Sequence, residues 1–201
     1  MLNAAASLDR RAEDRLAPRG LALALALALA LALPTGALAQ GATAQPLEPA
    51  DAPVAVLNVA LYNAQANLQE ASDSAKAVLA TEVLAGRLAE LLPEQIVAGA
   101  AREAGARGPQ CNAVVVCARD AAQAGGARWV VLAKVSKTSN LIWLFTGQLV
   151  HVPTGTIILD DSTELKGEPD AMVRAGTRIF AERVARTVKA GGATTNFPLQ
   201  P

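Results

Sequence analysis

Three β-rich stretches follow one another with only short links, and this pattern limits the possible folds more than any other feature. The stretches are "RWVVLAKVSKTS", "LIWLFTGQLVHV" and "IILDDSTEL". The first link lies at Ser139-Asn140. The second is "PTGT", whose Pro153 and Gly155 suit the second and fourth positions of a type I turn. Strands joined by such short turns pair antiparallel, so we expect an antiparallel meander over residues 128–165.

The segments before the meander show one strand pattern and one helix pattern. Residues 54–62, "VAVLNVALY", are β-rich and apolar on both faces, as in a central strand. From Ala75 onward the spacing is helical, and Pro93 ends this predicted helix. The expected apolar stripe of the helix consists of Val78, Thr81, Leu84, Leu88 and Leu91. Residues 95–98 fit either a short strand or the start of another helix, and we expect the strand.

Two further helices complete the pattern. Asn112 is a candidate N-cap for a helix that ends at Gly125-Gly126. Pro169 suits the first turn of a last helix over residues 170–189, which Gly191-Gly192 ends. The expected buried side chains of this last helix are Met172, Ile179, Val184 and Val188. The order β-α-(β)-α-β-β-β-α predicts a single α/β domain, a two-layer sandwich whose mixed sheet ends in the antiparallel meander.

The first 39 residues have the features of a secretory signal peptide. Four arginines precede a 13-residue apolar run, and small residues follow at Ala37 and Ala39. A membrane-spanning helix needs about 20 apolar residues, so this run is too short for an anchor. We expect cleavage after Ala39, a flexible leader at 40–53, the domain at 54–190 and a tail at 191–201. The expected location is the periplasm.

The charge of the chain excludes some partners. The whole chain has 18 basic and 18 acidic residues, and residues 1–39 hold four of the former and three of the latter. The remaining chain is therefore nearly neutral, so we expect no binding to nucleic acid and no attraction to an anionic membrane surface. No later segment has the length and apolarity of a membrane span.

Both cysteines lie in "CNAVVVC", and in an oxidising compartment such a pair favours a disulfide. Within one straight helix Cys111 and Cys117 would be about 9 Å apart, whereas a bridge needs Cα atoms within about 7 Å. Cys111 is therefore expected before the helix. Free buried thiols and a redox pair are the alternatives, although redox motifs space their thiols two residues apart. A metal site would need more ligands than these two sulfurs and one distant histidine.

A polar cluster at the first hairpin tip is the candidate surface for a partner. Its members are Lys134, Ser136, Lys137, Thr138, Ser139 and Asn140. The single histidine, His151, is interpreted as a structural side chain, and the acidic group in "LDDSTE" as a solvated strand end. No Gly-x-Ser-x-Gly motif and no phosphate-binding loop is present. We expect no cofactor, no metal and no enzymatic activity.

Three pieces of the sequence carry a resemblance to known proteins. They are "VAVLNVALY", the run "CARDAAQAGGARWVVLAKVSKTSNLI" and "PTGTIILDDSTELKGEPDAMVRAG". Together they resemble a family of small bacterial periplasmic proteins of unknown function. More remotely, they are similar to the amino-terminal α/β domain of the translocation protein TolB and to curli secretion lipoproteins. The resemblance covers residues 54–188, and it implies a location and a fold but no reaction.

Three functions follow in order of preference. The first is a periplasmic accessory domain that contacts an envelope protein, for which the edge strands of the sheet offer unpaired backbone groups. The second is a periplasmic protein that binds a small molecule or lipid between sheet and helices. The third is a thiol-disulfide oxidoreductase.

Overall fold

The computed structural model describes residues 45–63, 70–139 and 142–193. Contacts divide the chain into two units, residues 1–43 and 44–201, and all described residues belong to the second. The expected signal peptide lies outside the described residues, as does most of the tail. The elements are β1 (Val54–Val56), β2 (Ala60–Asn63), α1 (Asp73–Leu91), α2 (Ala100–Arg107), the 3-10 helix η2 (Pro109–Asn112), α3 (Val115–Ala124), β3 (Trp129–Lys137), β4 (Ile142–His151), β5 (Ile157–Lys166) and α4 (Pro169–Lys189).

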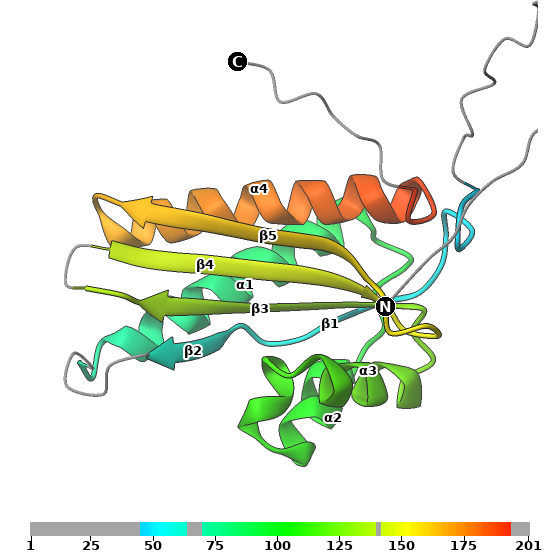
Figure 1. The fold of residues 1–201 in the computed structure, drawn as a ribbon, viewed down its shortest axis with the longest axis horizontal. Coiled ribbons are helices and arrows are strands. Elements are labelled where there is room, and N and C mark those ends of the chain that lie inside the picture. Colours follow the sequence, from blue (N-terminus) through cyan, green and yellow to red (C-terminus); the bar gives the residue numbers. More distant parts are fainter. Residues whose placement is uncertain (1–44, 64–69, 140–141, 194–201) are drawn as a thin grey trace, which may run out of the picture. The chain divides into compact units, whose positions relative to one another are not determined.

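The strands form one mixed sheet of five strands with β3 at its centre (Figure 1). On one side of β3, β1 and β2 both pair with it in parallel. On the other side β4 pairs with β3 antiparallel, and β5 pairs with β4 in the same way. The predicted α/β domain with a mixed sheet and a C-terminal meander is therefore confirmed.

The expected single strand at 54–62 is instead two strands. The chain leaves β1 at Leu57, whose N–H still donates to the carbonyl of Val131 at 3.0 Å. The N–H of Val59 donates to the Thr81 hydroxyl of α1 at 2.8 Å, and this bond replaces a ladder bond. The chain then rejoins β3 as β2.

Alternate side chains of β3 enter two different hydrophobic cores. Trp129, Val131 and Val135 lie in the larger core, together with Leu84 of α1 and Val184 of α4. Val130 and Leu132 lie in a smaller core, which is built from small side chains of α2 and α3 together with Cys111. Because successive side chains of a strand point to opposite faces, the pair α1–α4 covers one face and the pair α2–α3 covers part of the other (Figure 1). A third, partial layer thus adds to the two expected.

The helices differ from expectation in which residues they bury. In α1 the alanines Ala77 and Ala80 are buried beside Leu84 and Leu88, while Val78 is 57% exposed. The small alanines let the helix approach its neighbours closely, so the buried stripe is rotated from the predicted one.

In α4, Phe180 is buried and the predicted Ile179 is 59% exposed. Val173, Phe180, Val184 and Val188 are buried at spacings of seven and four residues, which makes a regular helical stripe. Ile179 lies on the neighbouring row of the helix surface.

Two local predictions between Pro93 and the meander are wrong. Residues 95–98 contain no strand, and Ile96 alone forms a single bridge to Val54. Helix α2 follows, and it begins after Gly99, whose φ of 91° is readily adopted only by glycine. Asn112 does not cap α3, because it belongs to η2, and Val114 precedes the helix without a side-chain cap.

The expected flexible leader is wrong for its second half, because that segment is part of the fold. The backbone N–H groups of Leu47 and Glu48 donate to the carbonyl of Gly191 at 2.7 and 3.2 Å. The buried Glu48 carboxylate accepts hydrogen bonds from Arg128 Nε at 2.8 Å and from His151 Nε2 at 2.7 Å. We call Glu48, Arg128 and His151 the ionic latch. The latch joins the start of the domain to β3 and β4, and the backbone bonds to Gly191 join the same segment to the residues after α4.

We predict that Gly147→Ala destabilises the fold by about 1–3 kcal/mol, because overpacking strains a filled core. A Cβ at Gly147 would lie 2.5 Å from the Phe180 ring. The matched control is Gly86→Ala in α1, where a Cβ would meet nothing within 4 Å, and where alanine should stabilise the helix by about 0.5–1 kcal/mol. Urea unfolding of both variants measures this. If Gly147→Ala and Gly86→Ala changed the free energy of unfolding equally, the packing of Phe180 in α4 against Gly147 in β4 would be contradicted.

A second prediction concerns pH. The hydrogen bonds from Arg128, and then from His151, hold the pKa of Glu48 below its ordinary value of 4.5 against the opposing effect of burial. A carboxylate with a lowered folded-state pKa stabilises the fold above its unfolded pKa and loses that effect as the pH falls through the folded value. The stability difference between the wild type and Glu48→Gln should therefore shrink between pH 5 and pH 3. A difference between the wild type and Glu48→Gln that stays constant over this pH range would show that the latch is not ionic.

Candidate binding surface

One half of the second sheet face is not covered by any helix of the described residues. The helices α2 and α3 cover Val130 and Leu132, but the next side chain of β3 on this face, Lys134, is only half-buried. We call this region the open face, and its members are Tyr62, Lys134, Leu144, Thr146 and Gln148. Tyr62 at the end of β2 is 55% exposed, and its ring lies 5.6 Å from Lys134 Nζ.

A disulfide fixes the border between the covered and the open half. Cys111 and Cys117 are bonded, with their Cα atoms 5.0 Å apart. As expected, Cys111 precedes the helix: it lies in η2 with its side chain in the smaller core, while Cys117 is in the first turns of α3. The bond closes the loop that carries Asn112 and Ala113 beside the open face. The predicted disulfide is thus confirmed.

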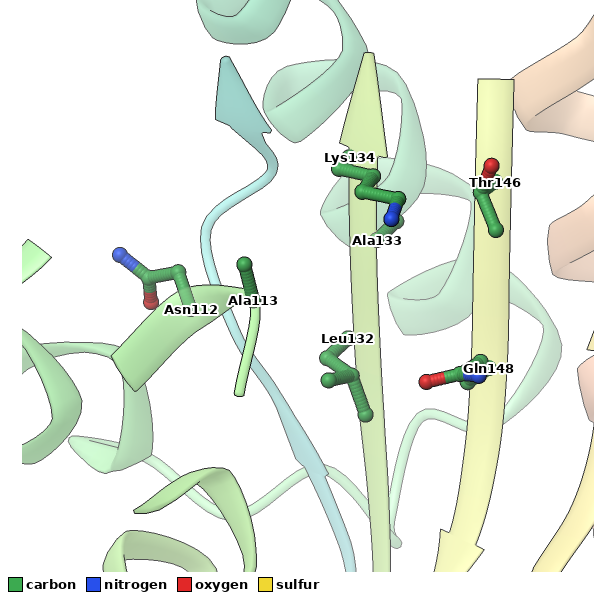
Figure 2. A pocket seen from close by; sticks show the side chains of 7 residues that line it. All are labelled: Asn112, Ala113, Leu132, Ala133, Lys134, Thr146 and Gln148. Carbon is green, nitrogen blue, oxygen red and sulfur yellow. The ribbon is translucent and has the colours of Figure 1, made fainter. Parts of the chain in front are cut away.

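A hollow of about 40 Å³ lies where this loop meets the sheet (Figure 2). Its lining residues are Asn112, Ala113, Leu132, Ala133, Lys134, Thr146 and Gln148. Leu132 is buried and forms the apolar floor, whereas the side chain of Ala133 lies in the larger core on the other face. Lys134, Thr146 and Gln148 contribute an ammonium, a hydroxyl and an amide to the walls, and the Oδ1 atom of Asn112 is buried without a hydrogen-bond partner.

The structure divides the residues of the predicted partner cluster between the two faces. Lys134 is at the hollow, but Ser136 on the same face is buried. Thr138 is exposed, and its hydroxyl donates to the carbonyl of Ile142 at 2.9 Å. Ser139 follows it, and Asn140 lies outside the described residues. A partner contact stays a prediction for Lys134, Thr138 and Ser139.

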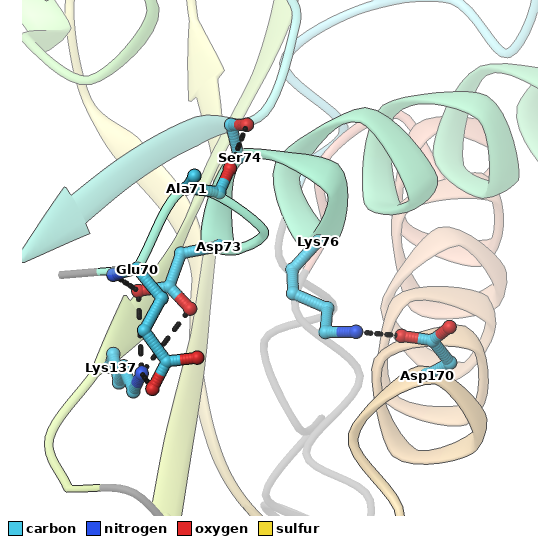
Figure 3. Close-up of polar contacts among 7 residues, drawn as sticks. All are labelled: Glu70, Ala71, Asp73, Ser74, Lys76, Lys137 and Asp170. Atoms are coloured by element: carbon cyan, nitrogen blue, oxygen red, sulfur yellow. Dashed lines mark hydrogen bonds and ion pairs between the residues drawn. The ribbon is translucent and has the colours of Figure 1, made fainter.

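Lys137 has a structural environment and is not presented on the surface (Figure 3). Its side chain is 4% exposed, and Nζ lies 2.9 Å from Glu70 Oε1 and 3.3 Å from Asp73 Oδ1. The Trp143 ring centroid is 5.9 Å away. The hydrogen bond to Glu70, together with that to the buried Asp73, raises the pKa of Lys137 against the effect of burial. This cluster ties the start of α1 to the end of β3, and the neighbouring ion pair Lys76–Asp170 ties α1 to α4.

The remaining candidate groups also have structural partners. His151 is buried in the latch, where its Nδ1 lies 2.9 Å from the Thr154 hydroxyl. Asp160 accepts a hydrogen bond from Gln148 at 3.2 Å, while Asp161 on the other face pairs with Arg183 at 2.5 Å. Burial is the main reason why the pKa of Asp161 is raised. Within the described residues no group of three or more His, Cys, Asp or Glu side chains could hold a metal ion.

We predict opposite outcomes for the two lysines of the tip. Lys137→Met should lower the Tm by roughly 5 °C or more, because Asp73 would stay buried without its cation. Lys134→Met should leave the Tm almost unchanged, because its side chain forms no ion pair within the described part of the chain. Thermal unfolding by circular dichroism measures both. A larger drop in Tm for Lys134→Met than for Lys137→Met would contradict the placement of Lys137 on the covered face and of Lys134 on the open face.

Solved structures similar to this chain share little sequence with it. The LpoB C-terminal domain from Salmonella enterica is 19% identical, with 59% of this chain and 85% of that chain covered and a TM-score of 0.42. PelC from Paraburkholderia phytofirmans is 15% identical, with 73% and 94% covered and a TM-score of 0.43. TolB from Acinetobacter baumannii, as the sequence resemblance predicted, is also similar: it is 15% identical, with 72% of this chain and 30% of that chain covered and a TM-score of 0.39.

No curated protein matches the sequence. In the part of the chain that the structure describes, none of the helices combines the length and apolarity needed to cross a bilayer. Residues 52–184 match the model of the DUF3280 family, whose description reads "Protein of unknown function (DUF2380)". The match runs from the start of β1 into α4 and spans more than half of the chain, and the chain therefore belongs to this family.

Proposed function

We propose that the protein is a periplasmic accessory domain that binds a protein of the cell envelope and catalyses no reaction. The location is supported by the N-terminal sequence, in which a basic start precedes an apolar run and a small-residue cleavage site. It is also supported by the disulfide, because such bonds persist in oxidising compartments and are rare in the cytosol.

The open face is the observation that carries the binding proposal. A sheet face usually packs against another layer, yet the helices α2 and α3 stop beside Leu132 and leave Tyr62, Leu144 and Thr146 without a helix over them. Tyrosine is enriched in protein interfaces because it combines a large apolar ring with a hydroxyl. The open face is therefore the best-suited surface for a partner within the described residues.

The edge strand β5 offers a second element of the same surface. It is ten residues long and pairs only with β4. Its outer edge has unpaired backbone groups that can accept a strand from a partner. The exposed Asp160 and Glu164 are charges of the kind that protect such edges from unspecific pairing.

The geometry favours a protein partner over the other two functions. The hollow of about 40 Å³ is much smaller than the ~300–1,000 Å³ of ordinary ligand pockets, so this hollow does not suit a small molecule or lipid. Redox motifs space their thiols two residues apart, whereas five residues separate Cys111 from Cys117 and Cys111 is fully buried, which argues against a thiol-disulfide oxidoreductase.

Photo-crosslinking in intact cells tests the proposal. The full-length gene is expressed with p-benzoylphenylalanine at Tyr62 or at Leu144 in the open face. We expect both positions to yield an adduct with the same envelope protein. The matched controls are Val78 and Ile179, which are exposed apolar residues of α1 and α4 on the opposite side of the sheet.

Two results would overturn this function. One is the absence of any adduct at Tyr62 and Leu144 in exported, folded protein. The other is an equal yield of the same adducts at all four positions, because contacts that are spread over both layers would not come from a docking surface.

A further inference from the structure

We propose that the hollow beside Lys134 binds the carboxylate of an aspartate or glutamate side chain from the protein partner. This inference rests on the proposed function and names the chemistry of the partner segment that crosses the open face.

Lys134 carries a charge that no carboxylate of the described residues compensates. Lys76, Lys137 and Lys166 each form an ion pair with a carboxylate. Lys134 forms none within the described residues, although its side chain is half-buried at the hollow and is held on the open face (Figure 2). The ring of Tyr62 at 5.6 Å compensates the ammonium only in part. A half-buried ammonium that has no ion pair within the described residues therefore favours an anionic group beside it in the hollow.

Two uncharged hydrogen-bond donors lie in the hollow beside the Lys134 ammonium. The Thr146 hydroxyl and the Gln148 amide line the same hollow, and a carboxylate accepts hydrogen bonds from ammonium, hydroxyl and amide groups. Gln148 already donates one hydrogen bond to Asp160 at 3.2 Å. By register, Asp160 and Glu164 of β5 lie on the same face as Lys134, one on each side of Ser162, which is opposite Thr146. The incoming carboxylate should therefore enter at Lys134 and Thr146, away from that edge.

The hollow is small and has an apolar floor. Its volume of about 40 Å³ above Leu132 admits the end of one side chain, and the apolar floor reduces the screening of an ion pair formed above it. The open face continues past the hollow toward Tyr62 and Leu144, where the rest of a partner segment can lie. The disulfide loop with Ala113 forms the opposite wall. These features fit a side chain of a bound protein segment.

The first test uses the crosslink at Tyr62. We expect Lys134→Gln to lower the adduct yield at least about fivefold, which corresponds to the loss of one partly buried charge pair. Lys189→Gln at the exposed end of α4, on the opposite side of the sheet, is the matched control, and its yield should stay at the wild-type level. If Lys134→Gln leaves the adduct unchanged, the carboxylate site is overturned while the proposed function stands.

The second test needs no knowledge of the partner. The exported protein is labelled with ¹⁵N and titrated with acetyl-Val-Glu-Val-amide, with acetyl-Val-Gln-Val-amide and with acetyl-Val-Gln-Val carrying a free carboxyl terminus. We expect only the glutamate peptide to shift the amide signals of Thr146 and Gln148. Lys134→Gln should abolish this shift.

Each other outcome of the titration counts against the inference. Equal shifts with the glutamine amide would show that charge is not recognised. Stronger shifts with the free carboxyl terminus would assign the site to a chain end instead of a side chain. If no adduct forms at Tyr62 in the wild type, the proposed function fails, and the titration alone then decides whether the hollow binds a carboxylate.

Discussion

The alternation of side chains along β3 is the constraint on which the rest of the structure depends. Trp129, Val131 and Val135 pack against α1 and α4, while Val130 and Leu132 pack against the smaller helices α2 and α3. Since each core requires this register, a shift of β3 by one residue would place both sets on the wrong face. The two faces therefore have separate roles, with the fully covered face providing most of the core.

The second face is shaped by where its helices end. The smaller core is built from alanines and from Cys111, so η2 and α3 lie close to the sheet, and the disulfide fixes the loop that borders them. Beyond Leu132 the sheet has no such cover within the described residues. The step between the two halves produces the hollow, and it places Lys134 at the border of an apolar floor. A structural bond and a candidate binding site thus share one loop.

Local patterns predicted the fold well, and contacts between distant residues account for what they missed. The meander, the last helix and the disulfide follow from turn residues, apolar spacing and geometry that the chain displays locally. The latch joins Glu48 to His151, 103 residues away, and no local pattern indicates that bond. The period of two in β3 did imply that Lys134 and Lys137 lie on opposite faces. Only the positions of the helices show that the face of Lys137 is the covered one.

The exposure of the open face is the most direct test of this account. Methyl-labelled protein, exported from the full-length gene, is placed in solution with a soluble paramagnetic reagent, and the relaxation of each methyl signal is measured. The methyl groups of Leu144 and Ile142 should be strongly broadened, whereas those of Val130 and Leu132 should be protected by α2 and α3. If Leu144 is protected as well as Leu132, another part of the chain covers this face, and the surface proposed for the partner does not exist.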